Sequence, residues 1–212
     1  MSSSKEPENS KTKSKFSRRG FLTSVGVTSG ALTSGILETE AEAQSTAKLS
    51  GPGEVPVTLQ INGKATRVSV EPRTTLLDTL RHRLDLTAAK RVCDRGTCGA
   101  CTVIVDGKVM YSCTVLAIDA QGRQITTLEG FSTERKPHAV TRAFVNNDAQ
   151  QCGYCTPGFV VAAKGFLDRN PNPTYDEVKK GLGGNLCRCG TYVGVRKAVL
   201  EAAKEIKGGN NA

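Results

Sequence analysis

The pattern of apolar and polar residues predicts mostly β-strands from Glu54 to about Leu128, and it opens with the two-residue alternation of a half-buried strand. The first alternating run consists of Val55, Val57, Leu59 and Ile61. Asn62-Gly63 follows it, a pair typical of a type I′ hairpin turn, and a return strand continues to Val70. This pattern predicts a hairpin at the start of a small sheet.

A helix is predicted to interrupt the strands at residues 74–84. Its apolar side chains share one helical face: Leu76, Leu77, Leu80 and Leu84. Further along, Asp106-Gly107 predicts a second hairpin, between strands at 102–105 and 109–111. The apolar residues assigned to a last short strand are Ile118 and Ile125. Residues 54–130 are therefore expected to form a mixed sheet with one helix.

From about Pro137 the apolar spacing becomes that of amphipathic helices. The predicted helices lie at 138–146, from 157 to 167, after Thr174, and at 195–206. Pro157 suits a first helical turn, and Thr174 with Glu177 forms an S/T-x-x-E capping box. Four short helices predict a four-helix bundle over residues 137–208, connected to the sheet domain by residues 129–136. The expected fold class is α+β.

Composition limits the classes of function. The 212 residues can bury a real core, so the eight cysteines are not needed merely as staples. No run approaches the roughly 20 apolar residues of a membrane span, so no stable membrane span is expected. The net charge of +9 is scattered, and four Tyr, six Phe and no Trp offer little stacking surface for bases. We therefore expect no nucleic acid partner, whereas an acidic protein partner remains open.

Residues 1–43 have the three regions of an export signal. A Lys-rich start leads to Arg18-Arg19-Gly20-Phe21-Leu22, then a weakly apolar run, then Ala41-Glu42-Ala43. The paired arginines resemble a twin-arginine signal, a route that carries folded, cofactor-containing proteins. The alternative is a disordered basic tail with a chance arginine pair. We expect export to the periplasm as a folded complex, with residues 44–53 as a linker.

The first group of cysteines has the spacing C-x4-C-x2-C with one more after eleven residues. Its members are Cys93, Cys98, Cys101 and Cys113. This is the plant-type spacing of [2Fe–2S] ligands. The intervening glycines permit positive φ angles and let backbone N–H groups approach the sulfurs, where hydrogen bonds tune a cluster's potential.

The second group places two cysteine pairs just before predicted helices. Its members are Cys152, Cys155, Cys187 and Cys189. Two helix N-termini facing each other would direct their positive ends at an anionic cluster of thiolates. Gly183-Gly184-Asn185 and Gly190 allow close backbone contact. The two groups predict two [2Fe–2S] clusters.

Other cysteine chemistries fit less well. Disulfides suit an exported protein, but these are metal-loop spacings with interleaved glycines. Zinc accepts four sulfurs, yet C-x4-C-x2-C and C-x-C depart from its usual ligand spacing. A dithiol at Cys152 and Cys155 would leave six cysteines unexplained. Haem attachment lacks its histidine, and neither His82 nor His138 adjoins a cysteine as Rieske ligation requires.

Three motifs together resemble the iron–sulfur subunit of the molybdenum hydroxylases, the xanthine dehydrogenase and aldehyde oxidoreductase family. They are Cys93-Asp-Arg-Gly-Thr-Cys98-Gly-Ala-Cys101-Thr-Val103, Gln151-Cys152-Gly-Tyr-Cys155-Thr-Pro-Gly158, and Gly184-Asn-Leu-Cys187-Arg-Cys189-Gly-Thr-Tyr192. The resemblance covers residues 54–207, and the export signal narrows it to the periplasmic aldehyde oxidoreductase type. Val92 departs from the family, which usually has glycine before the first cysteine.

The resemblance implies a ferredoxin-like β-grasp domain with the first cluster and a helical bundle with the second. It implies that Gln151 and Cys189 contact a molybdopterin held by a large subunit, while an FAD-binding medium subunit receives electrons. The whole enzyme would oxidise an aldehyde or N-heterocycle, and this chain would relay electrons without a catalytic acid, base or nucleophile. The competing interpretation is a stand-alone ferredoxin-like electron carrier.

Overall fold

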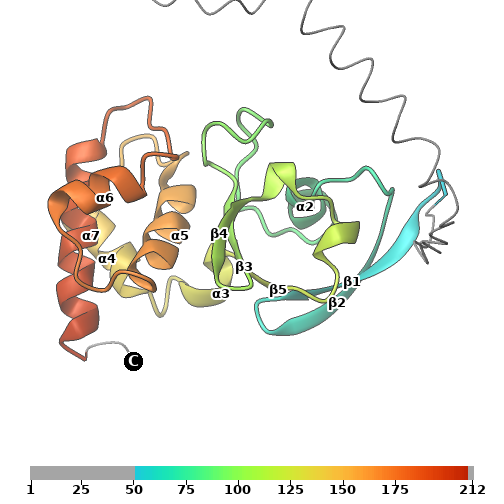
Figure 1. Ribbon diagram of the computed structural model, residues 1–212, viewed down its shortest axis with the longest axis horizontal. Coiled ribbons are helices and arrows are strands. Elements are labelled where there is room, and N and C mark those ends of the chain that lie inside the picture. The colour runs from blue at the N-terminus through green and yellow to red at the C-terminus, as the bar shows by residue number, and fades with distance from the viewer. Residues whose placement is uncertain (1–50, 210–212) are drawn as a thin grey trace, which may run out of the picture. The chain divides into compact units, whose positions relative to one another are not determined.

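The computed structural model describes residues 51–209, which all belong to one compact unit, Leu49–Ala212 (Figure 1). The predicted export signal and most of the predicted linker lie outside the described residues. The described part is a mixed α+β structure with a five-stranded sheet followed in the chain by several helices. None of the helices formed by residues 51–209 has the length and apolarity that a bilayer crossing requires.

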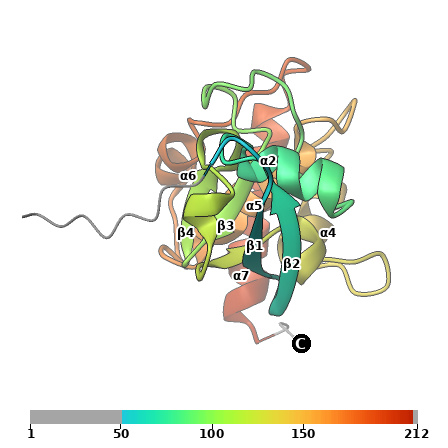
Figure 2. The ribbon, with the colours of Figure 1, turned by 90° about the vertical axis from the view of Figure 1, so that its right-hand side faces the viewer.

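The sheet has the strand order β2-β1-β5-β3-β4. Its strands are β1 (Val55–Ile61), β2 (Lys64–Val70), β3 (Thr102–Val105), β4 (Lys108–Tyr111) and β5 (Gln124–Thr126). β1 pairs antiparallel with β2, beside which it lies in Figure 2, and parallel with β5. Both Asx-Gly pairs have positive φ at both residues, as type I′ turns require: 51° and 78° at Asn62-Gly63, and 48° and 74° at Asp106-Gly107. The two predicted hairpins are confirmed.

The helix predicted at 74–84 is shorter and less regular than the leucine spacing indicates. It begins as α2 (Leu76–Asp78), capped by the Thr75 hydroxyl, which accepts from the Asp78 N–H at 3.1 Å. It then widens into a π-helical turn at Thr79–Arg83. Leucine spacing reports which side chains are buried, and Leu76, Leu77 and Leu80 are fully buried, but it does not distinguish a π-turn from an α-turn.

The assignment of Ile118 to the last strand is wrong. Ile118–Ala120 is a 3₁₀ turn, and β5 begins only at Gln124. The chain before that turn pairs away from the sheet: Leu116 forms a bridge with Thr75, and the Ala117 N–H donates to the Thr74 carbonyl at 2.9 Å. Ile125, by contrast, is buried in the sheet as expected.

The C-terminal helices are α4 (Ala139–Asn146), α5 (Thr156–Leu167), α6 (Tyr175–Gly181) and α7 (Tyr192–Lys207). α7 contacts each of the other three, and it begins three residues before the predicted position. The predicted capping box of Thr174 and Glu177 is present at α6. The segment expected as a plain connection carries a short extra helix, α3 (Leu128–Phe131).

Each half has its own apolar core. One lies between the sheet and α2, around Leu59, Leu76 and Val105, and the other lies among the helices, around Phe144 and Phe159. α5 joins the two halves because it packs along β3 and β4, where Gly165 contacts Val109. The first cysteine group flanks β3 and β4, and Cys152 and Cys155 directly precede α5.

Candidate metal centres

The first cysteine group is assembled by the β3–β4 hairpin. Cys93, Cys98 and Cys101 lie in the loop that leads into β3, and Cys113 lies in a 3₁₀ turn just after β4. Pairing of the two strands brings the ends of this stretch together: the Ser112 N–H and hydroxyl both donate to the Cys101 carbonyl, at 3.2 and 2.8 Å. The hairpin therefore places Cys113 beside Cys101.

The loop around this group needs its glycines. Asp94, Gly96 and Gly99 have positive φ angles of 55°, 70° and 69°. The Gly96 N–H donates to the Cys113 sulfur at 3.3 Å, and a Cβ on Gly96 would lie only 2.8 Å from a methyl of Thr114. The close N–H···S contact expected from the glycine content is thus present.

Arg91 forms ion pairs on the exposed side of the same loop. Its guanidinium contacts Asp94 at 2.6 Å and Asp78, at the end of α2, at 3.2 Å. Val92, the residue that departs from the family, is exposed and does not itself adopt a positive φ. The glycine usual at this position is therefore not required by the backbone seen here.

The thiols of the first group interact in two pairs, Cys93 with Cys98 and Cys101 with Cys113. Burial alone would raise the pKa of Cys93, but hydrogen bonds from the Thr97 hydroxyl and from the Arg95 and Thr97 backbone lower that pKa to about 6. Burial raises the pKa of Cys101 to about 12, against a backbone hydrogen bond from Cys113.

The second cysteine group lies at the starts of two helices. Cys155 is the N-cap residue of α5, with Cys152 three residues earlier, and Cys187 and Cys189 precede α7, whose N-cap is Thr191. The Cys187 N–H donates to the Tyr192 hydroxyl at 2.9 Å, and its sulfur lies 3.2 Å from the Thr191 hydroxyl. The N-terminal ends of α5 and α7, where partial positive charge accumulates, thus hold all four cysteines.

These thiols also interact in two pairs, Cys155 with Cys187 and Cys152 with Cys189. Burial raises the pKa of Cys155 to about 12, whereas hydrogen bonds from Thr191 overcome burial and lower the pKa of Cys187 to about 7. A backbone hydrogen bond from Tyr154 lowers the pKa of Cys152. A backbone hydrogen bond from Cys152 lowers the pKa of Cys189, but the hydrogen bond with the Cys152 side chain raises it, and the net effect is a raised pKa.

In both pairs of the second group, one thiol has a lowered pKa and its neighbour a raised one. Two adjacent thiolates repel each other, so a pair ionises fully only with a cation between its sulfurs. In a [2Fe–2S] cluster each iron takes two protein thiolates and two sulfides, and four cysteines arranged as two pairs fit that donor pattern. All eight cysteines are free thiols, and within residues 51–209 no three metal-binding side chains converge on a single point.

The two groups differ in exposure. In the first, Cys98, Cys101 and Cys113 are buried; in the second, Cys152 is exposed, and Gln151 beside it is exposed as well. Cys189, the partner of Cys152, is half-buried, whereas Cys187 is buried. The Cys152–Cys189 pair and Gln151 therefore form the edge of this group that is open to another molecule.

A network of polar residues surrounds and links the two groups, and the sequence patterns point to little of it. Its members are Thr97, Thr102, Tyr111, Asn185 and Thr191. All five lie in a quoted motif or a predicted strand, but only the backbone around Asn185 was given a role there, in the close approach before Cys187. Tyr111 and Asn185 bond to residues 73 and 86 positions away, whereas the hydroxyls of the three threonines bond within their own loops. No periodicity or motif spacing predicts the two long-range contacts.

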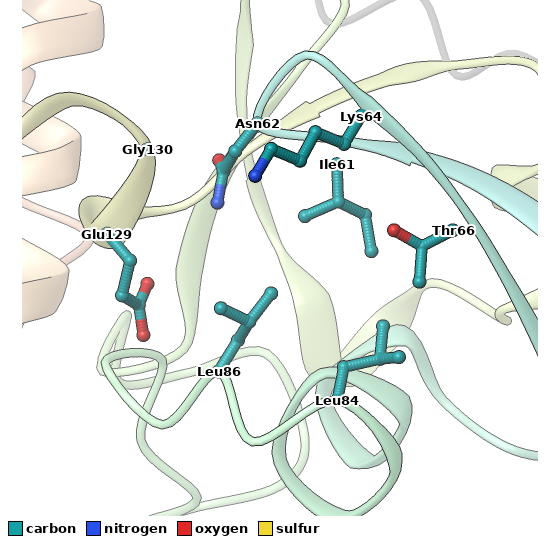
Figure 3. Close-up of a pocket in the computed structure, with 8 residues that line it drawn as sticks. All are labelled: Ile61, Asn62, Lys64, Thr66, Leu84, Leu86, Glu129 and Gly130. Carbon is teal, nitrogen blue, oxygen red and sulfur yellow. The ribbon is translucent and has the colours of Figure 1, made fainter.

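A cavity of about 460 Å³ lies apart from the cysteines, between the β1–β2 turn and the chain after α2 (Figure 3). Its floor is apolar, formed by Ile61, Leu84 and Leu86. Asn62 and Glu129 on its wall already bond within the protein: Asn62 with Thr127, and Glu129 with the Ala88 N–H at 2.8 Å. No cysteine lines this cavity, so the candidate metal chemistry lies elsewhere.

Comparison with known proteins agrees with two groups of four cysteine ligands. Residues 59–127 match the 2Fe-2S iron-sulfur cluster binding domain, and residues 127–200 match a second [2Fe-2S] binding domain. One relative is a subunit of the nicotinate dehydrogenase of Pseudomonas putida. It is 46% identical to this chain over 151 residues, which cover 71% of this chain and 96% of the relative.

Two further relatives extend the comparison. The iron-sulfur-binding subunit of an Escherichia coli K12 aldehyde oxidoreductase is 41% identical over 171 residues, 74% of this chain and 75% of that subunit. The crystal structure of quinoline 2-oxidoreductase from Pseudomonas putida 86 superposes with a TM-score of 0.70 at 40% identity, covering 74% of this chain and 98% of the matched chain. With two [2Fe–2S]-binding domains in this order, the chain belongs to the iron–sulfur subunits of the molybdenum hydroxylases, a family of oxidoreductases.

Proposed function

We propose that each cysteine group binds one [2Fe–2S] cluster and that the chain relays electrons between them. The proposed ligands are Cys93, Cys98, Cys101 and Cys113 for the first, and Cys152, Cys155, Cys187 and Cys189 for the second. When bound, a [2Fe–2S] cluster accepts and releases one electron at a time. The protein's part is to hold the thiolates, supply N–H donors to sulfur and limit the access of water.

The observation that carries this proposal is a backbone contact between the two cysteine groups. The Leu186 N–H donates to the carbonyl oxygen of Cys98 at 3.0 Å. Leu186 directly precedes Cys187. This one hydrogen bond therefore connects Cys98, a proposed ligand of the first cluster, to the residue next to Cys187, a proposed ligand of the second. Two isolated metal sites with structural roles would not need such proximity, whereas a relay does.

Exposure supports a direction for the relay. The open edge at Gln151, Cys152 and Cys189 would face a molybdopterin-binding large subunit, with Gln151 and Cys189 as contacts to the pterin. The inner pair, Cys155 with Cys187, adjoins the first group through Leu186 and Cys98. Electrons would then leave from the first group to an FAD-binding medium subunit.

The substrate of the whole enzyme would be an aldehyde or an N-heterocycle. Support comes from the relatives, which are named for nicotinate, quinoline and aldehydes. We propose residues 54–130 as the β-grasp domain of the first cluster and residues 137–208 as the four-helix bundle of the second. The arrangement of residues 1–43 supports periplasmic export of the folded complex by the twin-arginine route.

Analysis of the purified protein tests this proposal. We expect about four iron and about four acid-labile sulfide per chain, two of each per cluster. Zinc in place of iron, or no labile sulfide, would contradict it. Two larger polypeptides, one with molybdopterin and one with FAD, should co-purify; a chain that carries both clusters but purifies alone would instead be a stand-alone electron carrier.

A further inference from the structure

Asn185 makes a buried side-chain contact between the two halves of the molecule. The residue is 5% exposed, and its amide nitrogen donates to the Gly99 carbonyl at 2.9 Å and to the Thr102 hydroxyl at 3.3 Å. Gly99 lies 86 positions earlier in the chain, directly after Cys98. One amide group thus uses its N–H donors to connect the loop before Cys187 with the loop of the first cysteine group.

The receiving side is shaped for this amide. The Thr102 hydroxyl donates to the same Gly99 carbonyl at 2.5 Å, so two side chains converge on one oxygen. Gly99 has a φ of +69°, and a Cβ there would lie 2.6 Å from the Asn185 amide. A side chain at position 99 would therefore displace Asn185 from this contact.

The neighbours of Asn185 contact the same region through their backbone. The Gly184 carbonyl accepts from the Tyr111 hydroxyl at 3.0 Å, and the Leu186 N–H donates to the Cys98 carbonyl at 3.0 Å. Residues 184–186 thus make three consecutive contacts with the first cysteine loop and its hairpin. Of the three residues, Asn185 makes its contact through a side chain. Its amide is shielded from water, so its hydrogen bonds are not readily exchanged for bonds to water.

We propose that Asn185 is a positioning residue that sets the separation and mutual orientation of the two [2Fe–2S] clusters. The inference rests on the proposed function, because it presumes that both cysteine groups hold clusters. Asn185 binds next to Cys98 and stands two residues before Cys187, so a shift of its amide moves one ligand loop relative to the other. Without the amide donors, the Gly99 carbonyl keeps the Thr102 bond but loses its tie to the second loop.

Electron paramagnetic resonance of the reduced complex measures this geometry directly. Two reduced clusters are both paramagnetic, and their dipolar interaction, which falls with the cube of their separation, splits the signals. Asn185→Asp keeps the shape of the side chain, removes both N–H donors and directs a carboxylate at the Gly99 carbonyl. Asn185→Ala removes the contact without adding charge. We expect both variants to retain about four iron per chain and both cluster signals, with an altered or lost splitting.

Matched variants separate positioning from general disturbance. Asn146→Ala removes an exposed amide that bonds Glu201 within the helices at 2.8 Å, and it should leave the splitting unchanged. Thr102→Val removes the second donor to Gly99 and should alter the splitting in the same sense, whereas Thr102→Ser keeps the hydroxyl and should resemble the unmodified protein. If the Asn185 variants fail to assemble clusters, the comparison of Thr102→Val with Thr102→Ser tests the positioning role. Equal splitting in these two variants would then contradict it.

The outcomes distinguish this inference from the proposed function. Both clusters present and unchanged splitting in Asn185→Asp and Asn185→Ala would overturn the positioning role and leave the relay proposal intact. An unmodified complex with two clusters and no splitting would overturn it as well. An unmodified complex that lacks two clusters would refute the proposed function itself.

Discussion

Gly158, in the first turn of α5, lies directly against the carbonyl oxygen of Gly99. A Cβ on Gly158 would be 2.5 Å from that oxygen and 3.0 Å from the Cα of Ala100. The start of the helix that follows Cys155 is thus in backbone contact with the loop between Cys98 and Cys101. Any side chain at position 158 must push these two cysteine-bearing segments apart.

Replacing Gly158 with alanine should destabilise the protein. The added methyl meets backbone atoms that cannot rotate away, and overpacking of this kind costs about 1–3 kcal/mol. The gain in helix propensity, about 1 kcal/mol, offsets part of this cost. We expect a lower thermal unfolding midpoint, followed by far-ultraviolet circular dichroism, and reduced iron content per chain.

Gly165→Ala is the matched control, because it makes the same change later in α5. There the new Cβ meets the Val109 side chain rather than backbone, so the neighbour can adjust by moving a methyl group. The destabilisation should be smaller than that of Gly158→Ala. Equal effects of the two substitutions would mean that the Gly158–Gly99 contact is not tight in solution.

Single cysteine substitutions should separate the two clusters. Cys98→Ala removes a proposed ligand of the first cluster, and Cys155→Ala removes one of the second. Each should abolish one of the two reduced-state paramagnetic signals and lower the iron content from about four to about two per chain. The two-site assignment would be wrong if either substitution removed both signals while protein yield stayed normal.

The free energy of unfolding should depend on the protonation of His138 below pH 6.5. His138 is the N-cap residue of α4, and its Nδ1 accepts from the Val140 N–H at 3.2 Å. Burial, and then the charge of Lys164, lower its pKa below the ordinary 6.5. Below pH 6.5 the unfolded chain then binds more protons than the folded one. The contribution of neutral His138 to the free energy of unfolding is therefore complete above pH 6.5 and is lost as pH falls toward the folded-state pKa.

The measurement is the thermal unfolding midpoint of three proteins between about pH 8 and about pH 5.5. His138→Asn keeps a good N-cap acceptor but does not titrate, so its midpoint should depend less on pH than that of the unmodified protein. His138→Ala also does not titrate but loses the cap, which costs about 0.5–2 kcal/mol at every pH. An unchanged pH dependence in both variants would contradict the role assigned to His138.

The paired arginines should control export. Arg18-Arg19→Lys-Lys keeps the positive charge of the segment and removes the motif that the twin-arginine route recognises. We expect full-length protein to accumulate inside the cell, with its clusters assembled, and to disappear from the periplasmic fraction. Normal periplasmic levels of the variant would show that this pair does not direct transport.

Local sequence patterns predicted the elements that depend on near neighbours. The two Asx-Gly hairpins and the Thr174 capping box occur where they were expected, because each is decided within about four residues. The same reasoning failed where distant contacts decide the backbone. Ile118 leaves the sheet because its flanking residues bond to Thr74 and Thr75, and the leucines after Thr75 bury correctly in a helix that ends as a π-turn.

By itself, the sequence determined that eight cysteines form two groups with metal-loop spacing, each next to glycines. That conclusion needed only residue types and their separation along the chain. Tertiary structure alone decided which thiols pair, since Cys152 meets Cys189 and Cys155 meets Cys187 only after α5 and α7 pack together. It also decided that Asn185 bonds to Gly99 across 86 positions, because a hydrogen bond between distant segments depends on the packing of both halves and leaves no periodic signal.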